Sequence, residues 1–148
     1  MKTEHLTVSL ILQMGNRGKL SGPLLDRIDL TMEVGTLSAD ELQTAPAGEG
    51  TAAVRERVIA AHQRQHARQG KANAHLEAGE IETHCIADDK AKALLRQAIE
   101  RLGLSARAYH RTLRVARSVA DLAGVEVISA AHVAEAVQYR RGLPGTHK

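Results

Sequence analysis

Four arginines recur at helical spacing within residues 105–122. Arg107, Arg111, Arg114 and Arg117 follow one another at steps of four, three and three, which predicts that they share one face of a helix. Like charges on one face repel unless an anion compensates them, and the planar, always charged guanidinium group suits phosphate. We therefore consider this a candidate phosphate- or DNA-binding face. Arg107 is the first candidate because it lies near the expected helix N-terminus, where the backbone dipole favours an anion. A solvated helix face remains the alternative.

A fifth arginine that could contact phosphate, Arg27, lies far earlier in the chain. Arg27 stands within Leu24-Leu-Asp-Arg-Ile-Asp-Leu30, between an expected helical turn and a segment, residues 29–34, that alternates polar and apolar side chains like a strand. Spacing alone favours a surface arginine paired with Asp26 or Asp29, worth under about 1 kcal/mol. The sharper hypothesis is an arginine finger that reaches the γ-phosphate of a nucleotide held by a neighbouring subunit. Such a finger raises the rate by roughly 10³–10⁵ in GTPases.

Two other patterns do not satisfy the requirements of the chemistry they suggest. Gly15-Asn-Arg-Gly-Lys-Leu-Ser21 resembles a phosphate-binding loop, but Gln13 stands where that motif needs glycine and Leu20 where it needs a hydroxyl. His62 and His66 have the i, i+4 spacing of a metal-binding pair, yet no third ligand is evident and no glutamate follows His62. We interpret both histidines as surface residues and predict no metal site.

Composition indicates an all-α protein with a mildly basic helical half. Of 148 residues, 43% are hydrophobic but only 1% are aromatic, so the core must be built from aliphatic side chains, which favours helices over sheets. The net charge is +3, with the basic excess in residues 51–148. Cys85 is the single cysteine, so no intrachain disulfide can form. The apolar run at residues 6–14 is too short to span a bilayer. We expect a cytoplasmic protein.

Hydrophobic periodicity and end signals predict a bundle of four or five helices. Residues 1–50 are expected to form a poorly ordered leader with at most one stray strand, residues 51–141 the helical domain, and residues 142–148 a tail. Helix ends are expected where a capping residue or a glycine interrupts the pattern: Gly70, Asp88, Gly103, Ser105, Gly124 and Ser129. The expected inward positions are Val54, Val58 and Ala61; Ala91, Leu94, Leu95, Ala98, Ile99 and Leu102; Ala108, Thr112, Val115, Val119 and Leu122; and Val133, Ala136 and Val137.

Three blocks of sequence together resemble one family. The first is Ser21-Gly-Pro-Leu-Leu-Asp-Arg-Ile-Asp-Leu30, the second Leu104-Ser-Ala-Arg-Ala-Tyr-His-Arg-Thr-Leu-Arg-Val-Ala-Arg-Ser-Val-Ala-Asp-Leu122, and the third Ala130-Ala-His-Val-Ala-Glu-Ala-Val-Gln-Tyr-Arg140. Over about residues 20–141 the chain resembles the C-terminal part of bacterial magnesium-chelatase-like AAA+ ATPases, specifically the competence-related branch. Residues 1–19 do not match well.

The resemblance implies a role in a ring-forming ATPase. The competence-related members are DNA branch-migration helicases, and members closer to true chelatase subunits drive magnesium insertion into protoporphyrin. Arg27 falls on the arginine-finger position, and Arg107 falls on the sensor-2 position that opens the third helix of the lid domain. Residues 51–141 would form that lid. The implied partners are the AAA+ core in a homo-oligomeric ring and possibly DNA, with no membrane contact.

The family's Walker A, Walker B and sensor 1 would all precede residue 20, and the sequence there does not match them. We therefore expect that the chain alone hydrolyses no ATP and binds no cofactor, and that ATP and Mg²⁺ are bound in a complete ring. Three alternatives stay open. The chain could be a standalone helical module that binds DNA or a protein through the Arg107–Arg117 face, an ATPase subunit of magnesium chelatase, or a truncated gene product.

Overall fold

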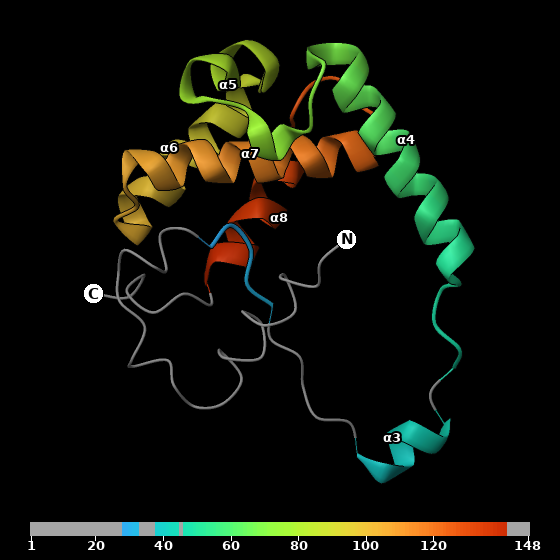
Figure 1. Ribbon diagram of the computed structural model, residues 1–148. Coiled ribbons are helices and arrows are strands. Elements are labelled where there is room, and N and C mark those ends of the chain that lie inside the picture. Colours follow the sequence, from blue (N-terminus) through green and yellow to red (C-terminus); the bar gives the residue numbers. More distant parts are fainter. Residues whose placement is uncertain (1–27, 33–37, 45, 142–148) are drawn as a thin grey trace.

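The computed structural model describes residues 28–32, 38–44 and 46–141 (Figure 1). Arg27, the loop at residues 15–21, most of the expected leader and the tail lie outside these residues. The regular elements of the described part are all helical, apart from one isolated parallel bridge between Ala87 and Ile128. The expectation of an all-α fold is confirmed. The elements are α3 (Ala39–Thr44), α4 (Thr51–Gln69), the 3₁₀ turn η2 (Asn73–His75), α5 (Ala78–His84), α6 (Asp89–Leu102), α7 (Ala106–Leu122) and α8 (Ala130–Arg141).

The helix boundaries follow the capping signals in the sequence. The side chain of Asp88 accepts a hydrogen bond of 2.7 Å from the amide of Ala91 at the start of α6, and Ser105 accepts one of 3.2 Å from Ala108 at the start of α7. Gly70 and Gly103 end α4 and α6 in the left-handed conformation, with φ of 72° and 59°. Local sequence therefore sets where these helices begin and end.

The core is aliphatic and centred on α7. Helix α7 crosses the middle of the molecule and packs against α8, α4, η2 and α5, while α6 packs on α8 (Figure 1). Small residues such as Ala116 and Ala120 are completely buried on α7, which lets neighbouring helices approach without aromatic side chains between them. The other buried apolar positions of α6, α7 and α8 are Ala91, Leu95, Ala98, Ala108, Leu113, Val133, Ala136 and Val137.

Helix α4 differs from its expected packing. Val54 and Val58 were expected to face inward, but they are 38% and 42% exposed. The physical reason is the position of the helix: its first turns project away from the bundle, and its buried residues are Ala61 and Gln65 in the second half (Figure 1). The apolar spacing was sufficient to predict the helix, but not which turns have a neighbour to pack against.

The inward face of α7 is also rotated from the expected one. Val115 and Val119 are half-buried, and Leu122 is 49% exposed. The buried side includes Leu113 and Ala116, together with the charged residues Arg117 and Asp121. Residues 28–32 form no strand, and a short helix, α3, lies within residues 1–50, which were expected to form a poorly ordered leader.

Candidate functional site

Arg107 lies exposed in the first turn of α7. The helix begins at Ala106, directly after the cap residue Ser105, so Arg107 belongs to the first turn, where the helix dipole favours an anion. Within the described part of the chain, Arg107 forms no hydrogen bond or ion pair. A shallow cavity of about 320 Å³ adjoins it. Its lining consists of Leu76, Ala78, Ile81, Ala106, Arg107, His110 and Arg114.

The next two arginines of α7 are engaged by other parts of the chain. Arg111 pairs with Asp29 across 2.7 Å, and its side chain is 16% exposed. Arg114 donates hydrogen bonds to the carbonyl oxygens of Ala74 and Leu76, at 3.1 and 3.2 Å. Both side chains therefore hold neighbouring segments against α7, and neither is unpartnered as Arg107 is.

The assignment of Arg117 to the phosphate- or DNA-binding face is wrong. Its side chain is 1% exposed, pairs with Asp121 across 3.1 Å, and donates to the carbonyl oxygens of Val125 and Glu126 in the turn before α8. At about 100° per residue, the four arginines spread over an arc of roughly 120°, with Arg111 and Arg117 at its edges. That arc is wide enough for Arg107 to reach solvent while Arg117 enters the core.

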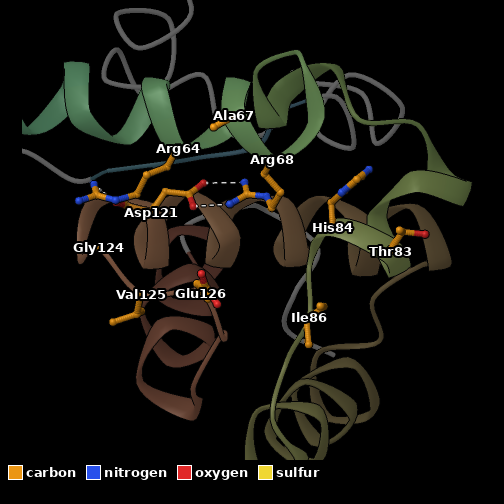
Figure 2. Close-up of a pocket in the computed structure, with 10 residues that line it drawn as sticks. All are labelled: Arg64, Ala67, Arg68, Thr83, His84, Ile86, Asp121, Gly124, Val125 and Glu126. Carbon is orange, nitrogen blue, oxygen red and sulfur yellow. Dashed lines mark hydrogen bonds and ion pairs between the residues drawn. The ribbon is translucent and has the colours of Figure 1, made fainter.

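Asp121 is the centre of a buried polar network that sequence reasoning did not identify. Its carboxylate accepts two hydrogen bonds from Arg68, at 2.7 and 3.0 Å (Figure 2). It also accepts one of 2.8 Å from Asn73. Burial alone would raise the pKa of Asp121. The hydrogen bonds from Arg68 and Asn73, together with the charges of Arg117 and Arg68, outweigh burial and hold the pKa below its ordinary value. Asp121 is therefore a charged structural residue.

Sequence offered only part of the signal for this network. The i, i+4 spacing of Arg117 and Asp121 could have suggested a pair within one helix. Arg68 and Asn73 are separated from Asp121 by 53 and 48 residues, so their contribution depends on how α4 and η2 pack on α7. No spacing rule relates such distant residues.

Comparison with known proteins establishes the relationship of these helices. Residues 48–140 match the family model described as magnesium chelatase, subunit ChlI C-terminal. The chain belongs to this family. The matched region takes in helices α4 to α7 and all but the last residue of α8, including Arg107 and the network around Asp121.

Individual relatives agree with the family match. The chain is 49% identical over 123 residues to the competence protein ComM of Haemophilus influenzae, an alignment that covers 82% of this chain and 24% of that protein. It is 46% identical over 127 residues to the protein YifB of Salmonella typhimurium and 42% identical over 127 residues to YifB of Escherichia coli, with the same coverage. The chain thus spans about a quarter of the length of these relatives.

The two histidines of α4 and the single cysteine do not form a cluster with other potential metal ligands in the described part of the chain. His62 and His66 are exposed on α4, as expected, and no group of three potential metal ligands is found in the described ranges. Cys85 is buried, and burial raises the pKa of its thiol to about 11. Among the described helices, none is long and apolar enough to cross a membrane.

Proposed function

We propose that this chain is the lid and sensor portion of a ring-forming, magnesium-chelatase-like AAA+ ATPase that acts on DNA. The family match to a C-terminal region and the coverage of about a quarter of each relative support a part that works with a larger ATPase core. In this proposal the complete ring binds ATP and Mg²⁺. The lid contributes charged side chains to sensing the nucleotide and has no catalytic activity alone.

The exposure of Arg107 is the observation that carries this proposal. Of the four arginines of α7, Arg111, Arg114 and Arg117 bond to other residues of the chain. Arg107 remains exposed at a helix N-terminus, with no bond to another described residue. A guanidinium there adds its charge to the helix dipole, and both favour a phosphate group. We assign Arg107 the sensor-2 role of contacting nucleotide phosphate.

We also propose that Arg27 is an arginine finger that acts on the nucleotide of a neighbouring subunit. Its own placement lies outside the described residues, but the residues that follow it are bonded to the helices. The carbonyl of Ile28 accepts a hydrogen bond from Arg140, and Asp29 pairs with Arg111. A finger joined in this way to α7 and α8 would respond to movement of the lid.

The test is to restore the lid to a complete ring. Residues 20–141 would replace the matching C-terminal region of the Haemophilus influenzae ComM protein, and ring assembly would be confirmed by size-exclusion chromatography. With DNA present, we expect Arg107→Ala and Arg27→Ala each to lower the rate of ATP hydrolysis by about tenfold or more. Arg101→Ala is the matched control, because Arg101 is also exposed but lies in the last turn of α6.

Two results would contradict the proposal. One is unchanged hydrolysis by the Arg107→Ala ring that assembles normally. The other is steady ATP turnover by this chain alone that disappears in Arg107→Ala, since the lid would then be an enzyme by itself. The alternative of a standalone module that binds through an Arg107–Arg117 face loses support, because Arg117 is buried and Arg111 and Arg114 have partners.

A further inference from the structure

A second cavity lies away from Arg107, between α4, the end of α5 and the turn that joins α7 to α8 (Figure 2). Its volume is about 570 Å³, within the range of small-ligand sites. Figure 2 shows Arg68 facing Asp121, with Arg64 beside them and with Thr83 and His84 projecting from another element. The polar and charged side chains of its lining are Arg64, Arg68, Thr83, His84, Asp121 and Glu126.

The lining of this cavity carries two arginines and two carboxylates, and the guanidinium group of Arg117, which pairs with Asp121 from outside the lining, adds a third positive charge. Asp121 is the one carboxylate within the network, and it faces two guanidinium groups, those of Arg68 and Arg117. Each oxygen of Asp121 already accepts two interactions, so this carboxylate has little capacity left for another cation. Arg64 adds a further positive charge, and its bond goes to the carbonyl of Asp121 rather than to a carboxylate. The exposed Glu126 is the other acidic group of the lining.

The arginines retain donors for a ligand. Arg68 uses four of its five N–H groups in bonds to Gln69, Asn73 and Asp121, which fix its orientation and leave one N–H on Nη1. Arg64 uses one of its N–H groups, at 3.0 Å from the carbonyl oxygen of Asp121. A guanidinium held in place before a ligand arrives loses little conformational entropy on binding.

We infer that this cavity binds a phosphate group. Donors are available from two elements: the guanidinium groups of Arg64 and Arg68 from α4, and the imidazole of His84 and hydroxyl of Thr83 from α5. A tetrahedral phosphate presents oxygens in several directions and can accept from both elements, whereas a planar carboxylate pairs best with one arginine fork. The phosphate can belong to a free phosphorylated molecule or to a nucleic-acid backbone. This site is separate from the one proposed around Arg107.

The test is a titration of the full ¹⁵N-labelled chain with inorganic phosphate at constant ionic strength, followed by NMR. We expect saturable shifts of the amides of Ala67, Ile86 and Gly124, which also line the cavity. Arg64→Gln should weaken the affinity by about tenfold, because it removes one charged donor. Arg57→Gln is the matched control: Arg57 lies on the same helix, is exposed, and bonds to Glu49, away from the cavity. Its affinity should be unchanged.

A second variant and a nucleic-acid competitor provide two further tests of the phosphate site. His84→Gln changes the second element and should weaken phosphate binding by about threefold, which keeps the test decisive if Arg64→Gln perturbs folding. A single-stranded octanucleotide that shifts the same amides and displaces phosphate would identify a nucleic-acid backbone as the source, and no displacement would identify a free phosphorylated molecule. Absence of saturable shifts at the cavity, or an equal loss in Arg57→Gln, would overturn the inference.

Discussion

Arg117 and Asp121 form an ion pair across 3.1 Å inside the helical bundle, with each side chain only 1% exposed. The pair joins consecutive turns of α7. Arg117 also reaches the turn before α8, and Asp121 reaches Arg68 on α4. Two helices, α7 and α4, and the turn before α8 are therefore connected through one buried pair. Removal of Asp121 would leave the buried guanidinium of Arg117 without a carboxylate partner, and removal of Arg117 would leave Asp121 with Arg68 as its one charged partner.

Arg117→Ala should destabilise the fold much more than Arg107→Ala, although both remove an arginine from α7. We expect Arg117→Ala to lower the free energy of unfolding by about 3–5 kcal/mol, because Asp121 loses a buried partner and two carbonyls lose a donor. Arg107→Ala should change it by less than about 0.5 kcal/mol, because Arg107 is exposed. Urea denaturation at pH 7 measures both. Equal losses would contradict the buried role of Arg117.

The network also predicts how stability depends on pH. The pKa of Asp121 is held below its ordinary value of 3.8, so the folded state favours the ionised form. Its contribution is fully present above pH 3.8 and is lost as the pH falls through the lower pKa of the folded state. Urea denaturation between pH 6 and 2 should show this loss in the wild-type chain. In Asp121→Asn, the stability at pH 6 should already be lower, and the decline with acid should be smaller than in Asp89→Asn, a variant at an exposed aspartate.

The capping residues and the helical period were sufficient to predict the helices, because those signals act within a few residues. Asp88 and Ser105 cap α6 and α7 as expected, and Val133 and Val137 face the core. Arg117 was misplaced for a physical reason. A charged residue in a helical pattern normally indicates the solvent side, and its burial here depends on Asp121 and on backbone carbonyls that become available only when the turn before α8 folds back.

One part of the candidate sites could be predicted from local sequence, and another part depends on tertiary packing. The position of Arg107 follows from local sequence, since Ser105 starts the helix and the next turn is exposed. The second cavity combines α4, α5 and the α7–α8 turn, and the partners of Arg68 are distant in sequence. Pairing at such separations is determined by tertiary packing, which local sequence patterns do not specify.

Glycine at position 103 is required by the backbone, while glycine at position 79 is not. Gly103 ends α6 with φ of 59°, where a β-carbon is strained, so Gly103→Ala should lower the free energy of unfolding by about 1 kcal/mol. Gly79 lies in α5, does not have a positive φ, and has open space where a β-carbon would be added. Gly79→Ala should raise stability by about 0.4–1 kcal/mol. Thermal unfolding of both variants measures the difference, and a loss in Gly79→Ala as large as that in Gly103→Ala would contradict this explanation.

The segment that follows Arg27 should be held against α7 and α8 by contacts far apart in sequence. The amide and hydroxyl of Thr31 both donate to the carbonyl oxygen of Tyr139, at 2.9 and 2.6 Å, and Asp29 pairs with Arg111. The Thr31 amide should therefore be protected from hydrogen exchange. Asp29→Asn weakens a partly exposed ion pair worth up to about 1 kcal/mol, so protection of Thr31 should fall by up to about fivefold.

Asp40→Asn is the matched control for this exchange measurement, because Asp40 is an exposed aspartate on α3 and does not pair with Arg111. It should leave the Thr31 amide unchanged. Arg111→Gln should reduce protection by the same factor as Asp29→Asn, and the double variant should lose no more than either single one, because both changes remove one interaction. If the wild-type Thr31 amide exchanges at the rate of an unstructured peptide, residues 28–32 are not held against α7 and α8. The proposed coupling of Arg27 to the lid would then fail as well.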